Sequence, residues 1–303
     1  MYPDWGLGII CDALGYSRQA YYKHLKTEAV EQLQEAVIVK MVGDLRQKMP
    51  RLGGKKLYHM LNEPLQAHQI DIGRDKFFDI LGAYNLLVRK RKRRKPLTTD
   101  SDHPFFKYPN LIRNLEVLRP NQLWVSDITY IPVDKGFCYL SLITDAYSRK
   151  IVGWCLWENL KRDGTVQALK NAMVGCDSRS LIGLIHHSDR GLQYCSGEYT
   201  ELLSTSGVLI SMTEKGDPYE NAIAERVNGI LKTEFSLGDG FSSYAAARDA
   251  VCGAIETYNT LRPHASCNYL TPDQAHKLEG RLKSKWKKDA TPQNTPVAEA
   301  LLL

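Results

Sequence analysis

The sequence predicts an α/β protein in which a small all-α region precedes a mixed five-stranded sheet with flanking helices. Two observations carry this prediction. Apolar residues recur at helical spacing through the first hundred residues, and short β-branched and aromatic segments take over from about residue 118. Three of these segments follow one another before helices and strands alternate, which indicates a mixed sheet covered by helices.

The front of the chain is expected to form short helices. The helical pattern opens at residue 9 and predicts further helices over 16–25, 28–48, 53–63 and 73–85. Ser17 is the expected entry to the second helix, and a loop containing Pro64 is expected between the last two. Short tandem helices with basic residues between them suggest a helix-turn-helix type module, although small helical domains of any purpose share this pattern.

The rest of the chain is expected to contain the sheet. Strands are expected over 122–133, 137–148, 150–157, 181–189 and 208–213. Helices are expected over 163–175, 197–207, 219–235 and 243–262. This order is compatible with a ribonuclease H-like fold, although secondary structure alone does not single that fold out.

Charge is distributed unevenly along the chain. The net charge is +6, and residues 1–120 carry 21 Lys and Arg against 13 Asp and Glu, whereas the other 183 residues carry 19 against 21. Seven consecutive cations follow the helical region, namely Arg89, Lys90, Arg91, Lys92, Arg93, Arg94 and Lys95. Such a run is often a solvated linker, and it also suits a DNA backbone, where each phosphate contact releases counterions. We therefore expect a polyanionic partner for the front of the chain.

Composition argues against a membrane protein and against a disulfide framework. No apolar run approaches the roughly 20 residues that cross a bilayer. The N-terminus lacks the basic stretch and the small-residue cleavage site of a signal peptide. The seven cysteines form no CxxC pair, which favours buried reduced thiols. The chain is therefore expected in the cytoplasm, associated with the nucleoid if it binds DNA.

Three acidic residues lie where the expected sheet could bring them together. Asp127 lies inside the first strand, Asp189 ends the fourth strand in "HHSDRGLQY", and Glu225 lies on a later helix. An acid buried in a central strand is costly unless a cation lies beside it. Each acid also has a plain alternative role. Asp127 could cap a turn or pair with a lysine, Asp189 could simply terminate a strand, and Glu225 could be a surface acid.

Three carboxylates at one edge of a sheet would suit two Mg²⁺ ions. Mg²⁺ prefers oxygen ligands and is held by a few carboxylates together with water and substrate phosphate. Two such ions roughly 4 Å apart can activate an attacking oxygen and stabilise the leaving one in phosphodiester chemistry. Around the third acid, Asn221, Glu225, Asn228 and Lys232 follow helical spacing and share one face.

Four sequence blocks carry a family resemblance. They are "DITYIPV", "HSDRGLQY", "ENAIAERVNGILKTE" and "YNTLRPH", the last followed by "LTP". In this order, with 35 residues between the second aspartate and the glutamate, they resemble the DDE transposases of bacterial insertion sequences, relatives of the retroviral integrases. The resemblance is closest to the second-frame product of the insertion-sequence three family. It is strong over about 115–275 and weaker over about 35–98.

The resemblance implies that Asp127, Asp189 and Glu225 are the catalytic triad and bind two Mg²⁺ ions, with Mn²⁺ as a substitute. Lys232 matches a basic position close to the scissile end of the DNA, and Asn221 and Asn228 are further candidates for DNA contact.

Five residues are expected to support the site. His187 matches the histidine before the second acid, and a lone histidine there is expected to pack or hydrogen-bond rather than bind metal. The remaining residues come from "YNTLRPH", where a structural or DNA-proximal role is expected for Tyr258, Asn259, Arg262 and His264.

The function implied by the resemblance is Mg²⁺-dependent cleavage at the ends of an insertion sequence followed by strand transfer, along a copy-out, paste-in route. The alternatives are a catalytically inactive DNA-binding repressor and a structure-selective nuclease on the same fold. The implied partners are double-stranded DNA, both the terminal inverted repeats and the target, and further copies of the chain in a synaptic complex. The family's upstream leucine-zipper pattern is not seen, so a first-frame product or frameshift fusion is a further expected partner.

We accordingly divide the chain into five segments. They are an N-terminal helical segment (1–34), a helix-turn-helix-like region ending in the basic run (35–98), a linker (99–117), a ribonuclease H-like integrase catalytic core (118–275) and a C-terminal tail (276–303).

Overall fold

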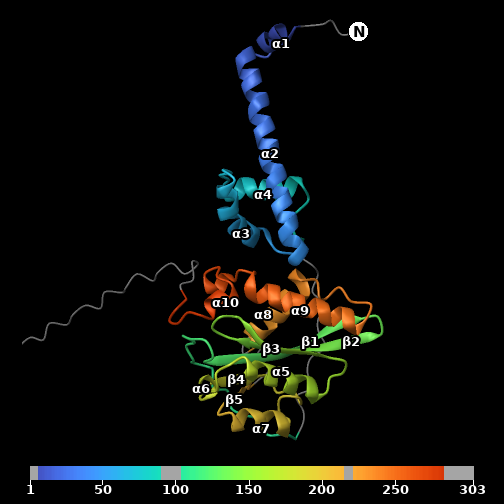
Figure 1. Cartoon of the computed structure of the whole chain (residues 1–303), viewed down its shortest axis with the longest axis vertical. Helices are drawn as coiled ribbons and strands as arrows, with labels where there is room; N and C mark the ends of the chain where they lie inside the picture. The colour runs from blue at the N-terminus through green and yellow to red at the C-terminus, as the bar shows by residue number, and fades with distance from the viewer. Residues whose placement is uncertain (1–5, 90–103, 215–220, 283–303) are drawn as a thin grey trace, which may run out of the picture. The chain divides into compact units, whose positions relative to one another are not determined.

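The computed structural model describes residues 6–89, 104–214 and 221–282, which fold into two compact units (Figure 1). The units interleave along the sequence. The first, here called the helical unit, comprises Met1–Thr99, Tyr130–Cys138 and Asn228–Thr257. The second, here called the sheet unit, comprises Asp100–Thr129, Tyr139–Val227 and Tyr258–Leu303. Among the described residues, no helix is both long enough and apolar enough to cross a membrane.

The helical unit opens with four helices. They are α1 (Leu7–Ala13), α2 (Arg18–Lys48), α3 (Gly54–Ala67) and α4 (Arg74–Ala83). Ser17 caps α2 as expected, because its hydroxyl accepts a hydrogen bond from the Ala20 N–H at 3.1 Å. The separate helices predicted over 16–25 and 28–48 are wrong, since α2 is one helix of 31 residues. The junction at residues 26–28 reads Lys-Thr-Glu and contains no glycine or proline that would end the helix.

The loop predicted around Pro64 is also wrong, because Pro64 lies inside α3. A proline in a helix removes one N–H donor, and here it does so close to the C-terminal end of the helix. Continuing the helix past Pro64 brings Leu65 onto the same buried face as Leu61 and Leu57. This apolar packing offsets the lost hydrogen bond.

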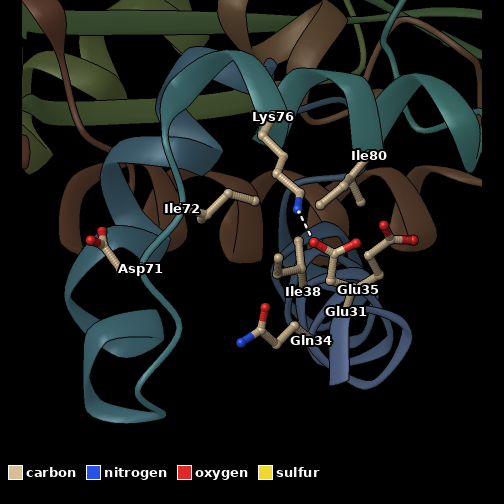
Figure 2. A pocket seen from close by; sticks show the side chains of 8 residues that line it. All are labelled: Glu31, Gln34, Glu35, Ile38, Asp71, Ile72, Lys76 and Ile80. Atoms are coloured by element: carbon tan, nitrogen blue, oxygen red, sulfur yellow. Dashed lines mark hydrogen bonds and ion pairs between the residues drawn. The ribbon is translucent and has the colours of Figure 1, made fainter. Parts of the chain in front are cut away.

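The buried residues of α2 all lie in its second half. Every residue from Asp12 to Leu33 is exposed, whereas Ile38 and Val42 are buried. Near the middle of α2, the Lys76 ammonium on α4 lies 3.1 Å from the Glu31 carboxylate on α2 (Figure 2). The cavity beside this ion pair measures about 30 Å³, which is room for little more than a water molecule.

The five expected strands form one sheet. They are β1 (Leu123–Val133), β2 (Gly136–Asp145), β3 (Ile151–Trp157), β4 (Ile185–Ser188) and β5 (Leu209–Met212), in the order β3-β2-β1-β4-β5. β2 and β3 pair antiparallel, whereas β4 pairs parallel with both β1 and β5. The predicted mixed five-stranded sheet with flanking helices and its preceding all-helical region are therefore confirmed.

Side chains of β1 alternate between the two faces of the sheet. Trp124 joins a buried cluster with residues of α5 (Arg162–Val174) and α7 (Gly197–Thr205), which lie on the same face of the sheet in Figure 1. Leu123 and Val125 point the other way and pack with Ala224 from the start of α8 (Ala222–Glu234). The remaining elements are α6 (Ser178–Leu181), α9 (Tyr244–Thr260), a 3₁₀ turn (Ala265–Cys267) and α10 (Pro272–Ala275).

Candidate active site

The register of the central strands brings two of the predicted acids level with each other. In the parallel pair of β1 and β4, Leu123 lies opposite Ile185 and Val125 opposite His187. Two residues further along, Asp127 is still within β1 and Asp189 directly follows β4. Because side chains repeat every two residues along a strand, Asp127 shares the face of Val125, the face that Ala224 covers. Adjacent parallel strands therefore present both aspartates at one edge of the sheet.

Both aspartates are held by backbone donors. The Ile128 N–H donates to Asp127 Oδ1 at 2.9 Å, and the Gly191 N–H donates to Asp189 Oδ1 at 2.9 Å. Both residues are half-buried. One carboxylate oxygen of each residue thus takes part in fixing the local chain, which limits the orientations that the two side chains can adopt.

Asn221 ties the start of α8 to the same strand. Its buried side-chain amide donates to the Ser126 carbonyl at 3.0 Å, one residue before Asp127. The backbone carbonyl of Asn221 accepts the Glu225 N–H at 3.2 Å. This amide therefore fixes where α8 begins relative to β1, and Glu225 follows one turn later with an exposed side chain.

The donor set at this edge suits a hard divalent cation. Within the described part of the chain, no group of three or more His, Cys, Asp or Glu side chains is close enough to hold a metal ion, so the three acids do not form such a group in this structure. Two of them are brought level by the strand register, and Mg²⁺ commonly takes one or two protein carboxylates and completes its shell with water and phosphate oxygens. Asp127 and Asp189 fit that requirement by their chemistry.

Two buried histidines lie on β4 just before the second aspartate. His187 Nδ1 lies 2.8 Å from the Ser211 hydroxyl on β5, an arrangement that links two strands. His186 Nε2 lies 2.6 Å from the Ser126 hydroxyl and 2.9 Å from the Tyr199 hydroxyl. Burial, followed by the charge of His187, lowers the pKa of His186 to about 3, so His186 is neutral at physiological pH.

The sequence pattern gave no role to His186, Ser126 or Tyr199. From a single sequence, a polar residue inside a strand is usually interpreted as facing solvent or as a candidate ligand, not as part of a buried hydrogen-bond network. The available signal was the odd placement of a histidine at residue 186, after the apolar residues "LIGLI" of a central strand.

The "YNTLRPH" segment braces the turn between β2 and β3. Asn259 accepts a hydrogen bond from the Ile151 N–H and donates to the Ile151 carbonyl, both at 3.0 Å. The Tyr258 hydroxyl donates to the Arg149 carbonyl at 3.0 Å, and the buried Arg262 guanidinium lies over the Tyr258 ring. The His264 ring lies 2.8 Å from the Ser266 hydroxyl. These contacts give the segment a structural role in holding the sheet.

The residues predicted to contact DNA lie in different environments. Lys232 is half-buried and lies two turns after Glu225 on α8, whereas Asn221 and Asn228 are buried. Arg89 is exposed, and the rest of the basic run, residues 90–95, lies outside the described residues. DNA contact stays a prediction for all of them.

Comparison with known proteins identifies an integrase core domain in this chain. Two family models, both described as integrase core domain, match residues 118–218 and 206–272. The chain is 33% identical over 267 residues to the uncharacterized 31 kDa protein of insertion element IS600 from Shigella sonnei, a match that covers 87% of this chain and 96% of that protein. It is 27% identical over 283 residues to the transposase for insertion sequence element IS629 from Shigella sonnei, covering 90% of this chain and 92% of that one.

Among solved structures, the catalytic core domain of HTLV-2 integrase, in complex with magnesium, aligns with 53% of this chain and 99% of its own. The TM-score is 0.42 and the sequence identity is 24%.

Proposed function

The chain belongs to the DDE transposases of bacterial insertion sequences, and we propose that it cuts DNA at the ends of its element and joins the freed ends to new DNA in a reaction that needs divalent metal ions. The observation that carries this proposal is the parallel register that places Asp127 level with Asp189 at one edge of the sheet. A polynucleotidyl transferase needs carboxylates at such a point, because the reacting phosphate carries negative charge that metal ions must balance.

Asp127, Asp189 and Glu225 are the residues that would hold the metal ions. When bound, Mg²⁺ or Mn²⁺ ions supply charge neutralisation and align the attacking and leaving oxygens. Asp127 and Asp189 bring two carboxylates from adjacent strands, and the amide of Asn221 keeps the start of α8 beside them. Glu225 would complete the set when the DNA is bound.

The proposed reaction takes place in two displacements. Water attacks the phosphodiester at the element end, the bond between phosphorus and the 3′-oxygen breaks, and that oxygen leaves as a 3′-hydroxyl after taking up a proton. The 3′-hydroxyl then loses its proton as it attacks a second phosphodiester, forms a new bond to that phosphorus and releases another 3′-oxygen, which takes up a proton. Along a copy-out, paste-in route the second phosphodiester first belongs to the other end of the element and later to the target.

The remaining partners follow from charge and from the reaction itself. The basic run 89–95 and Lys232 would hold the DNA backbone, and the region 35–98 would recognise the terminal repeats, leaving 118–275 as the catalytic core. Two element ends must meet for joining, which favours several copies of the chain on one DNA complex. A first-frame product or frameshift fusion would supply further contacts, and the reaction would take place on the nucleoid.

The test is a cleavage and joining assay on a labelled duplex that carries the element's own end, with Mg²⁺ or Mn²⁺. We expect Asp189→Asn to lower both products by more than about 100-fold, since even loss of an outer-shell partner costs about 10–100-fold. Asp163→Asn is the matched control, because Asp163 is an exposed aspartate at the start of α5 and should leave both products unchanged.

The other outcomes separate the competing functions. Nicking without joining would replace the transposase by a structure-selective nuclease. DNA binding with neither product, even at saturating metal, would favour a repressor. Full activity of Asp189→Asn would remove the proposed site altogether.

A further inference from the structure

Tyr194 carries a buried hydroxyl that the proposed mechanism does not yet use. Tyr194 lies five residues after Asp189, in the turn that leads from β4 to α7, and its side chain is 2% exposed. Its hydroxyl is fully shielded from solvent and has no hydrogen-bond partner among the described residues. Leaving a buried polar group unsatisfied costs about 1–3 kcal/mol, so such a group in a native fold requires an explanation.

The neighbours of Tyr194 hold its ring without satisfying its hydroxyl. The ring packs edge-on against Tyr199, with centroids 5.4 Å apart, and lies 6.4 Å from the His186 ring. Tyr199 uses its own hydroxyl to bond His186, which in turn bonds Ser126 beside Asp127. Two tyrosines therefore share one buried cluster, and of their two hydroxyls only that of Tyr194 has no hydrogen-bond partner among the described residues.

The turn that carries Tyr194 is fixed to Asp189. The Gly191 N–H donates to Asp189 Oδ1 at 2.9 Å, and the Gly191 carbonyl accepts the Tyr194 N–H at 3.0 Å. The two aspartates also act on the hydroxyl through space. After burial and Tyr199, the negative charges of Asp127 and Asp189 raise the pKa of Tyr194 well above its ordinary value. The hydroxyl therefore keeps its proton and stays a donor, the role that complements a nearby carboxylate.

We propose that Tyr194 is a positioning residue for the aspartate pair, whose hydroxyl donates a hydrogen bond to the carboxylate of Asp127 or Asp189 when the metal ions are bound. This inference rests on the proposed function. A bond from a hydroxyl to a carboxylate is charge-assisted and strong, and it would hold one carboxylate oxygen while the other faces the metal. Partners of this kind, one shell out from the metal, set the orientation of the ligands themselves.

The test replaces the hydroxyl alone, in the full chain, with Tyr194→Phe. Mn²⁺ binding without DNA, followed by the electron paramagnetic resonance signal of free Mn²⁺, and the Mg²⁺ dependence of cleavage would both be measured. We expect the half-saturating concentration of each metal to rise by about 10-fold, the lower end of outer-shell effects, with cleavage restored at high Mg²⁺. The unfolding temperature without metal should not fall, because no hydrogen bond to a described residue is lost.

Tyr147→Phe is the matched control. Tyr147 is also buried in the sheet unit. Its hydroxyl donates to the Gly280 carbonyl at 2.9 Å, so this hydroxyl, unlike that of Tyr194, already has a hydrogen-bond partner. Its removal should lower the unfolding temperature and leave the metal dependence as in the wild type. This opposite pattern separates positioning from general stability.

Asp189→Asn, measured in parallel, keeps the two proposals apart. If Asp189→Asn abolishes cleavage while Tyr194→Phe has the metal dependence of the wild type, the role of Tyr194 is overturned and the proposed function stands. If Asp189→Asn still cleaves, the proposed function itself fails. A raised metal requirement in Tyr194→Phe alone, with Tyr147→Phe unchanged, supports the positioning role.

Discussion

His186 is a fully buried histidine whose neutral form the fold requires. Its Nε2 is shared between the hydroxyls of Ser126 and Tyr199, and burial with the nearby His187 keeps the pKa at about 3. In the unfolded chain a histidine has a pKa near 6.5. Between pH 3 and pH 6.5, His186 therefore binds a proton in the unfolded chain but not in the folded chain.

The pH dependence of stability follows from this difference. The contribution of His186 is fully present above about pH 6.5 and is lost progressively as the pH falls toward 3. In His186→Gln, which keeps a polar side chain of similar reach, we expect lower stability at neutral pH and a slope of unfolding free energy against pH that is shallower by one proton in this window. Denaturant unfolding of both chains between pH 4.5 and 7.5 checks this, and equal slopes would contradict it.

At the residue scale, the acidic residues of the site are easier to predict from the sequence than the buried residues around them. Asp127 stands out because an acid inside an apolar strand is costly to bury. Asp127 precedes Asp189 by 62 positions, the same offset that the register gives between Leu123 and Ile185. That match is visible only once the two strands are known to be parallel neighbours. Tyr194 could not be found in the same way, because neither its burial nor its unsatisfied hydroxyl leaves a trace in residue spacing.

At the scale of the elements, close packing of α5 on β3 depends on one glycine. A Cβ built on Gly153 would lie 2.4 Å from the Ala168 carbonyl oxygen and 2.5 Å from the Ala172 Cβ. Both of these atoms belong to the helix, one of them to its backbone, so α5 could not remain where it is. Val166 and Leu169 of α5 belong to the same buried apolar cluster as Trp124 of β1.

Gly153→Ala is therefore expected to destabilise the chain by about 1–3 kcal/mol or more, the range for overpacking a well-packed interior. Gly253→Ala is the control, since nothing lies within 4 Å of the added Cβ and Gly253 lies in the interior of α9. There alanine should stabilise by up to about 1 kcal/mol through helix propensity. Urea unfolding measures both, and equal effects from the two substitutions would refute the packing argument.

The elements themselves were predicted well wherever a strong periodicity met no competing signal. All five strands appear where β-branched and aromatic runs indicated them. The errors concern helix boundaries and the start of one strand, which was expected at residue 181, whereas β4 begins at Ile185 and Leu181 ends α6. Residues 26–28 lack apolar side chains, so the helical pattern is interrupted there, although α2 continues through them. Pro64 suggested a loop, but α3 continues past it and buries Leu65. Local propensity is a weak guide where packing decides.

At the scale of the whole molecule, the charge asymmetry of the sequence defines how the chain should meet DNA. The front carries the excess of cations, and its densest part is the run 89–95, which separates the four N-terminal helices from the five-stranded sheet. Cations in such a run can contact phosphates whatever the base sequence. They would therefore add affinity without adding specificity.

Replacing the seven cations of 89–95 by glutamine tests this directly. We expect DNA binding to weaken by a similar factor on the element end and on an unrelated duplex, because both present the same phosphates. The slope of log affinity against log salt should become shallower by as much as about six, since each phosphate contact contributes roughly 0.9 to it. Fluorescence anisotropy titrations at several salt concentrations measure both quantities. A loss confined to the element end would show that the run reads bases, and an unchanged salt slope would make it a plain linker.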